Sequence, residues 1–261
     1  MMKQILSSCV IAFSTYSRIP MPQVEWNEKN MRHMLAFFPL VGAAVGAVFW
    51  VASVLCGLLD IGPVLRAALL TAVPVAVTGG IHMDGYCDTV DALASHASRE
   101  KKLAILKDSS AGAFAVIWCC VWFLAYFALL TELESAATIA ACFVLSRALS
   151  ATGVDRLPSA RPVSGPQAGM GSELKRSSRF PWWMLGSYLA LWAAAVALWG
   201  AWCPGLAALA AAAAFYFVYR AVALRQFGGF TGDLAGWFLQ ICELAMLAAA
   251  VLAERMETVW F

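Results

Sequence analysis

Long apolar stretches alternate with short polar segments along the whole chain. Each stretch approaches the length of about 20 residues that a helix needs to cross the hydrocarbon core of a membrane, and a helix satisfies its own backbone hydrogen bonds there. The stretches cover residues 37–58, 64–81, 112–130, 136–154, 182–199, 205–224 and 233–253. They predict an all-α fold, a polytopic integral membrane bundle of about seven transmembrane helices that forms a single transmembrane domain over residues 1–261.

Composition supports a membrane protein over a soluble one. Hydrophobic residues make up 62% of the 261 residues and charged residues 13%, against roughly 45–50% and about 25% in soluble domains. The same values exclude a disordered chain and a secreted disulfide scaffold. The formal net charge of +2 lacks the basic excess of a nucleic-acid-binding protein, so we expect the lipid bilayer and small molecules as partners. The sequence leaves open whether copies assemble into a homo-oligomer.

The basic residues predict the orientation of the chain, because Lys and Arg are retained on the cytoplasmic side. The turns near 59–63, 131–135 and 200–204 contain none. We therefore expect the N-terminus in the cytoplasm and the C-terminus outside. The cytoplasmic parts would be an N-terminal segment (1–36), an acidic catalytic segment (82–111) and a basic loop (155–181). Fifteen of the 18 basic residues share this face: Lys3, Arg18, Lys29, Arg32, Arg99, Lys101, Lys102, Lys107, Arg156, Arg161, Lys175, Arg176, Arg179, Arg220 and Arg225.

Residues 1–16 are only loosely similar to a signal peptide. Lys3 precedes an apolar run, but Ser7, Ser8 and Ser14 interrupt it and no small-x-small cleavage site follows. The run is also too short to span a membrane. We therefore expect an interfacial or re-entrant helix at the cytoplasmic surface.

Three carboxylates mark the end of the second apolar stretch. Asp84, Asp88 and Asp91 are spaced i, i+4 and i+7, so on a helix of about 3.6 residues per turn they share one face. Like charges packed this closely favour a bound cation, and oxygen ligands without sulfur suit Mg²⁺. Asp108 is a fourth candidate ligand further along the same polar segment. The alternative is a solvated helix end with capping Asp residues.

Other polar residues near the same end are candidates for the chemistry. His82, two residues before the first Asp, can act as a general base or orient a phosphate, and a purely structural role is the alternative. The Gly-rich segment 228–233 opens the last apolar stretch, where backbone N–H groups can approach phosphate or Asp233 can simply cap the helix. Arg147 and Glu243 lie inside apolar stretches, where a charge is costly, and we expect them to form a buried pair.

Several short segments match, in order, one known family of membrane enzymes. They are residues 13–22, 38–42 and 79–91, then Lys107-Asp108 with Gly112, Ser146-Arg147, and Gly229-x-Thr231-Gly232-Asp233. On these segments the chain resembles the cobalamin synthase family, adenosylcobinamide-GDP ribazoletransferase, a polytopic membrane enzyme of late cobalamin (vitamin B12) assembly. The resemblance implies the bacterial cytoplasmic (inner) membrane as the location. The chain departs from the family pattern at Ala115, where a glycine is expected, and at Trp237, where a smaller residue is usual.

The resemblance implies transfer of the adenosylcobinamide-phosphate group from adenosylcobinamide-GDP to α-ribazole or its 5′-phosphate, releasing GMP and forming adenosylcobalamin or its 5′-phosphate. Two alternatives are a Mg²⁺-dependent CDP-alcohol phosphotransferase, whose Asp spacing differs, and a secondary transporter, which would place acids near the bilayer midplane in repeated halves. The resemblance implies Mg²⁺ ligands at Asp84, Asp88, Asp91 and Asp108, catalytic residues at His82, Asp84, Asp88 and Asp91, and substrate-binding residues at Lys107, Gly112, Arg147, Gly228, Gly229, Thr231, Gly232 and Asp233.

Overall fold

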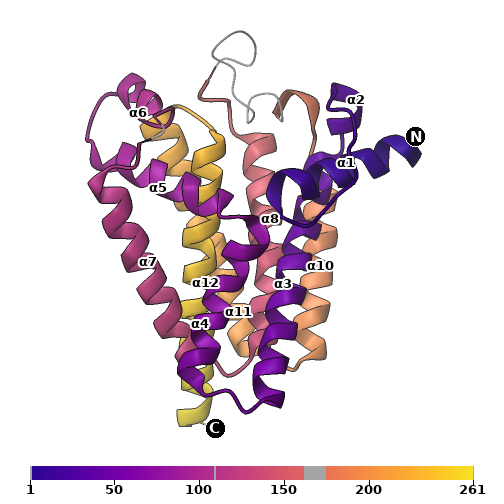
Figure 1. Ribbon diagram of the computed structural model, residues 1–261, viewed down its shortest axis with the longest axis vertical. Coiled ribbons are helices and arrows are strands. Elements are labelled where there is room, and N and C mark those ends of the chain that lie inside the picture. The colour runs from indigo at the N-terminus through magenta and orange to yellow at the C-terminus, as the bar shows by residue number, and fades with distance from the viewer. Residues whose placement is uncertain (1, 109, 162–174, 261) are drawn as a thin grey trace.

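Seven of the helices in the described part of the chain form an up-and-down bundle, with the two chain ends at opposite ends of it (Figure 1). The computed structural model describes residues 2–108, 110–161 and 175–260. Each helix lies within or close to a predicted apolar stretch, which confirms the helical membrane bundle. The seven are α3 (Met34–Leu58), α4 (Pro63–Thr78), α7 (Ala113–Glu132), α8 (Ala136–Arg156), α10 (Trp182–Leu198), α11 (Trp202–Val222) and α12 (Gly232–Trp260).

Not all seven helices are equally long. By length and hydropathy, five of the described helices can cross a membrane, or up to six if α4 and the following α5 (Ile81–Ala94) count as one bent span. The α10 helix is apolar but has only 17 residues. The second apolar stretch, predicted to reach residue 81, ends as a helix at Thr78. The cause is Gly79 and Gly80, whose φ angles of 66° and 81° are accessible to glycine and break the helix.

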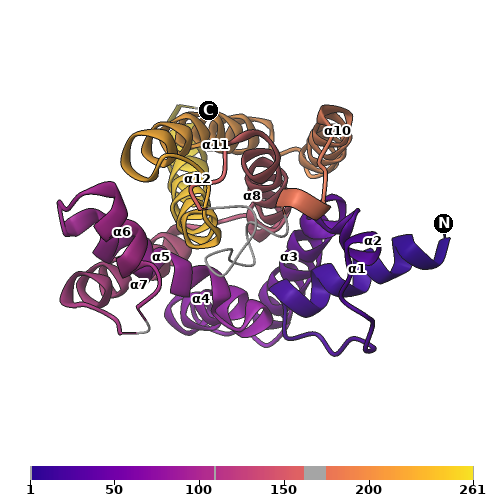
Figure 2. The same cartoon turned by 90° about the horizontal axis from the view of Figure 1, so that it is seen from above.

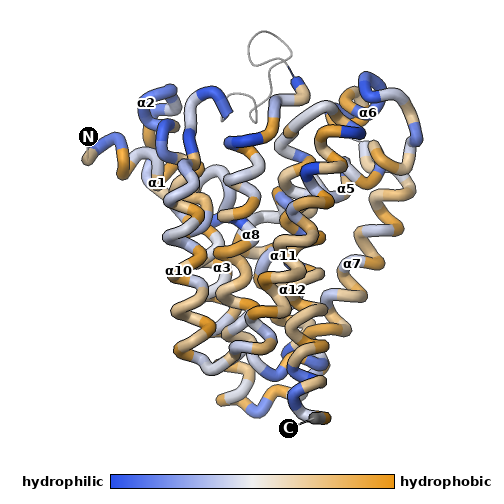
Figure 3. The backbone as a smooth tube through the Cα atoms, turned by 180° about the vertical axis from the view of Figure 1, so that it is seen from behind, coloured by the Kyte–Doolittle hydropathy of each residue, from blue (hydrophilic) through white to orange (hydrophobic). Residues whose placement is uncertain are grey.

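The polar elements gather at the end of the bundle that holds the N-terminus. There the chain forms α1 (Met2–Tyr16), α2 (Glu28–Met31), α5, α6 (Arg99–Ile105) and the π-helix η1 (Ala223–Phe227). Figures 1 and 2 show α1 and α5 lying across this end rather than along the bundle. At 15 residues α1 is too short to cross a membrane, as expected. Figure 3 shows hydrophilic segments at both ends and a largely apolar middle.

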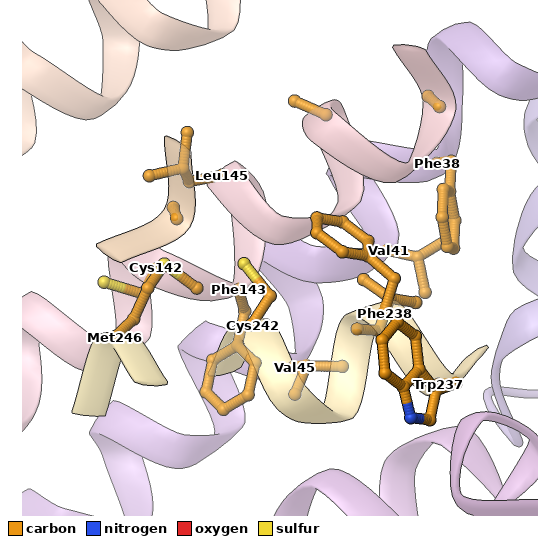
Figure 4. Packing of buried hydrophobic residues seen from close by; sticks show 14 of the residues in the cluster. Phe38, Val41, Val45, Cys142, Phe143, Leu145, Trp237, Phe238, Cys242 and Met246 are labelled. Carbon is orange, nitrogen blue, oxygen red and sulfur yellow. The ribbon is translucent and has the colours of Figure 1, made fainter. Parts of the chain in front are cut away.

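The core lies where α3, α8 and α12 meet. The spanning window of α8 is 83% buried and that of α12 is 72% buried, against 22% in α7. Figure 4 shows Val41, Phe143, Phe238 and Cys242 packed against one another from these three helices. The α8 helix is therefore central, while α7 and α11 keep much of their apolar surface for lipid.

A buried ion pair joins α8 to α12 inside this core. The guanidinium of Arg147 contacts the carboxylate of Glu243, and both side chains are almost fully buried. The hydroxyl of Ser146 donates a hydrogen bond to the same carboxylate at 2.9 Å. The predicted pairing of the two charges is confirmed, and it offsets part of the cost of burying either charge alone.

Candidate active site

The sharp bend between α4 and α5 carries the acidic motif to the polar end of the bundle. The two helix axes differ by 93°, so α4 runs along the bundle while α5 lies across its end. The backbone N–H of Arg18 donates to the carbonyl of Val77 at 2.7 Å, next to the bend. The Arg18 side chain also packs directly on Gly79, since a Cβ there would collide with it. The N-terminal segment thus braces the bend that orients the acids.

A close crossing of α5 and α12 brings a further carboxylate to the motif. A Cβ on Gly85 would lie 2.8 Å from the carbonyl oxygen of Asp233, and a Cβ on Gly236 would lie 2.9 Å from that of His82. Only glycine at these positions allows the two backbones to approach so closely. Asp233, predicted as part of a phosphate-binding loop, therefore lies beside Asp84.

The carboxylates at this crossing act strongly on one another. Burial and the negative charges of Asp84, Asp233 and Asp91 raise the pKa of Asp88 to about 6. Burial and neighbouring negative charge both disfavour the ionised form of a carboxyl group. A cation placed between these groups would favour the ionised form again.

The fit to Mg²⁺ rests on a small number of ligands. Among the described residues no group of three or more His, Cys, Asp or Glu converges closely enough to hold a metal ion by itself. Mg²⁺ commonly keeps several waters and binds one or two carboxylates together with substrate phosphates. Asp84 and Asp88, one helical turn apart with Asp233 nearby, match that donor set.

Two of the predicted metal ligands have other partners in the structure. The carboxylate of Asp91 accepts hydrogen bonds from the backbone N–H groups of Gly112 at 2.5 Å and Ala115 at 2.9 Å, at the start of α7. Asp91 therefore caps that helix. Asp108 is exposed and accepts from the N–H of Ser110 at 2.9 Å, and it is not among the carboxylates that raise the pKa of Asp88. The structure thus places Asp233, not Asp108, with Asp84 and Asp88.

A cationic side chain faces this acidic cluster from the loop after α8. Nη2 of Arg161 lies 3.6 Å from the Asp233 carboxylate. The loop is held by a short parallel bridge, in which Phe230 N–H donates to the Pro158 carbonyl at 2.7 Å. Part of the predicted basic loop 155–181, residues 162–174, lies outside the described residues. Among the residues of that loop that the structure describes, Arg161 is the one that lines the site.

A cavity of about 200 Å³ lies beside the acidic cluster, between α1, α3, α5, α8 and α12. Asp84, Arg161 and Asp233 line it together with Thr231 and Gly232 at the start of α12. Because Asp84 and Gly232 are exposed, the cavity opens on the polar end of the bundle. Its remaining lining is mostly apolar and aromatic: Tyr16, Leu35, Phe38, Ile81, Val154, Phe230, Ala235 and Leu239 among others.

His82 lines the same cavity and has a constrained ring. The ring stacks on Tyr16 with centroids 5.9 Å apart and meets Phe38 edge-on, also at 5.9 Å. Burial, with the positive charge of Arg147, lowers the pKa of His82 well below its usual value, so the imidazole is neutral. Its Nε2 atom is buried and has no hydrogen-bond partner within the described part of the chain. A bound molecule can supply that partner.

Some of the predicted substrate-binding residues line the cavity, and others lie away from it. Thr231 lines the cavity and its hydroxyl accepts from the N–H of Leu234 at 3.1 Å, which caps α12 and directs the helix N-terminus at the cavity. Gly228 packs against the guanidinium of Arg99, and Gly229 against the backbone of Pro158. These two glycines serve close packing. Lys107 is exposed on the surface. Arg147 pairs with Glu243, and it is not among the described residues that line the cavity.

Most residues that line the cavity were not predicted as site residues, among them Tyr16, Phe38, Ser150 and Arg161. Tyr16 and Phe38 lie inside two of the family-like segments, but an aromatic residue in an apolar stretch carries no sign of a function. Ser150 is a polar residue in a predicted span, which is a weak indication. Arg161 lies in a loop that matches no recognised motif. Only the packing of α1, α3, α8 and α12 brings the four together.

Comparison with known proteins identifies the family. The chain matches the model of a family described as cobalamin-5-phosphate synthase over residues 8–251. The chain belongs to this family. The predicted resemblance is thereby confirmed, and the chain is an enzyme of this family rather than a transporter.

Curated relatives cover nearly the whole chain. A protein of Lachnoclostridium phytofermentans named adenosylcobinamide-GDP ribazoletransferase is 42% identical over 251 residues, 95% of each chain. A protein of the same name from Desulfitobacterium hafniense is 34% identical, and the match covers 92% of this chain and 94% of the relative. Another from Listeria monocytogenes is 33% identical, and the match covers 95% of this chain and 98% of the relative. No solved structure gives a significant match to the chain.

Proposed function

We propose that the protein transfers the adenosylcobinamide-phosphate group from adenosylcobinamide-GDP to α-ribazole or α-ribazole 5′-phosphate, in late cobalamin biosynthesis. Family membership and the shared name of the relatives support this reaction. A ribose hydroxyl of the acceptor attacks the phosphorus next to the corrinoid, the bond to the second phosphate breaks, and GMP and one proton leave. The observation that carries the proposal is the acidic cluster at the opening of a cavity lined by His82, whose Nε2 atom has no hydrogen-bond partner among the described residues.

Asp84 and Asp88, with Asp233 facing them, are the residues that would hold Mg²⁺ against the diphosphate. Bound there, the cation would offset the negative charge of the reacting phosphates. The raised pKa of Asp88 supports this assignment, because its acidic neighbours contribute to it and a cation between the carboxylates would offset their repulsion. Asp91 would act indirectly, by fixing the start of α7 against α5.

The remaining groups at the opening suit a phosphate and a hydroxyl. Arg161 and the N-terminus of α12 present positive charge and backbone N–H groups where phosphate oxygens would lie. His82 is neutral and its Nε2 is free of other hydrogen bonds within the described residues, so it can accept the hydroxyl proton. Lys107, which is exposed, would contact the nucleotide only from the surface.

We further propose that the polar end of the bundle faces the cytoplasm of a bacterial cell, with the protein in the cytoplasmic (inner) membrane. The support is the concentration of Lys and Arg in the segments that form this end. Both substrates are large polar molecules that would then reach the cavity from the cytoplasm.

Reconstituted protein tests the reaction directly. Liposomes containing the wild type are supplied with adenosylcobinamide-GDP, α-ribazole and Mg²⁺, and GMP release and the corrinoid mass are followed. We expect product from the wild type and loss of about 100-fold or more of the turnover in Asp84→Asn. Folded wild-type protein that forms no product with either form of the riboside would refute the proposed reaction, and CDP-alcohols would be tried next. Full turnover and unchanged Mg²⁺ dependence in Asp84→Asn would refute the metal assignment alone.

A further inference from the structure

We propose that the cavity binds the acceptor riboside with its aromatic base inserted, while the corrinoid and the guanine of the donor stay outside. This inference rests on the proposed function and assigns one of its two substrates to a place. It draws on the volume of the cavity, the chemistry of its walls, and the position of its polar atoms.

The volume selects a small ligand. The cavity measures about 200 Å³. An apolar cavity of about 150 Å³ is known to accept benzene, so this one suits a fused two-ring base. A corrin ring with its amide side chains is many times larger and cannot enter. Of the two substrates, only a part the size of a base fits.

The walls select an aromatic ring with few polar groups. Tyr16, Phe38 and Phe230 line the cavity, together with Leu35, Val154 and Leu239. Aromatic walls favour a flat ring by stacking and by edge contacts. The deep part offers few polar atoms, so guanine, which has donors and acceptors around its edge, would leave several of them unpaired at a considerable cost. The base of a riboside such as α-ribazole avoids that cost.

Two buried polar atoms mark where such a riboside would form hydrogen bonds. Oγ of Ser150 and Nε2 of His82 both have no partner among the described residues, although Ser150 is 0% and His82 only 4% exposed. Both residues line the cavity. A heteroaromatic base can accept from Ser150, while a ribose hydroxyl can donate to His82. A purely apolar ligand would leave both atoms unpaired.

The direction of entry follows from the position of the charges. Gly232 and Leu239 both line the cavity and lie seven residues apart on α12, which corresponds to a depth of about 10 Å. Asp84, Asp233 and Arg161 line the cavity near its exposed opening, whereas Ser150 is fully buried and lies six residues, or about 9 Å, before the polar end of α8 at Arg156, which makes it the deep end. A riboside bound with its base inward therefore presents its ribose hydroxyls at the acidic cluster. The diphosphate of the donor approaches that point from the polar end of the bundle.

Filling the deep end tests the assignment. Ser150→Leu inserts three further carbon atoms next to the base. We expect the KM for α-ribazole to rise about tenfold or more, since one misplaced methylene in a tight site already changes binding by about that factor. The KM for adenosylcobinamide-GDP and inhibition by GMP should stay within about twofold of wild type. Ser187→Leu, at an exposed position of α10, is the matched control and should leave all three values unchanged.

A second variant and a binding measurement keep the test independent of folding and of turnover. Phe38→Leu removes one aromatic wall and should raise the KM for α-ribazole by about two- to tenfold, again without effect on the donor. In equilibrium dialysis, the Asp84→Asn variant should bind α-ribazole with wild-type affinity. The double variant Asp84→Asn/Ser150→Leu should bind α-ribazole much more weakly.

Three results would overturn the inference. One is an unchanged KM for α-ribazole in folded, active Ser150→Leu and Phe38→Leu, which would leave the proposed reaction intact. Another is a rise in the KM for the donor or in the inhibition constant of GMP instead, which would place guanine in the cavity. The third is a wild type that forms no product at all, which would remove the proposed reaction and the inference with it.

Discussion

The close crossing of α5 and α12 predicts a large effect of one methyl group at Gly85. The Cβ of Gly85→Ala would lie 2.8 Å from the carbonyl oxygen and 2.9 Å from Cα of Asp233, and both are backbone atoms that cannot rotate away. Ordinary contact begins at 3.4 Å, so the helices must separate by about 0.6 Å or more. Displacements approaching 1 Å at a reacting centre cost about 100-fold in rate. We expect kcat/KM to fall by about that factor.

The stability of this variant should change much less. Overpacking costs about 1–3 kcal/mol, and the better helix propensity of alanine offsets about 1 kcal/mol of it. The assay is GMP release by protein in liposomes, with thermal unfolding in detergent measured in parallel. Gly186→Ala is the matched control, because its Cβ would meet nothing within 4 Å, and it should keep wild-type activity. Wild-type kcat/KM in folded Gly85→Ala would show that the spacing of α5 and α12 does not control the site.

Three further predictions concern charges at and below the site. Burial and acidic neighbours raise the pKa of Asp88 to about 6, and the deprotonated form is the one that binds a cation. The Mg²⁺ concentration for half-maximal activity should therefore rise steeply as the pH falls below 6, which a Mg²⁺ titration repeated at each pH would measure. An equal Mg²⁺ requirement at pH 5 and pH 7 would contradict this. Asp91→Ala should lower the free energy of unfolding by about 1 kcal/mol through the lost cap of α7, with the Mg²⁺ requirement of the folded enzyme unchanged; a shifted requirement would instead make Asp91 a ligand. Arg147→Met alone should destabilise the protein by about 3–5 kcal/mol in thermal or denaturant unfolding, because Glu243 is left unpaired, and Arg147→Met/Glu243→Leu should recover most of that loss; additive damage would show that the pair is not coupled.

The sequence by itself determined the parts of the molecule that depend on local spacing. Apolar stretches of near-membrane length specify helices whatever they pack against, because a helix satisfies its backbone within the segment. The i, i+4 spacing likewise places Asp84 and Asp88 one turn apart on α5 before any neighbour is known. The family segments were recognisable for the same reason, since they are contiguous in the chain.

The tertiary structure decided which of these local groups share a site. Asp91 continues the acidic face of α5, yet its carboxylate accepts hydrogen bonds from backbone N–H groups at the start of α7. Asp233 joins Asp84 because Gly85 and Gly236 let α5 and α12 cross closely. Tyr16, Phe38, Ser150 and Arg161 meet around one cavity although more than a hundred residues separate the first from the last. Helix crossings are set by packing among all the helices at once, so residue type and spacing within one helix cannot reveal which side chains they bring together.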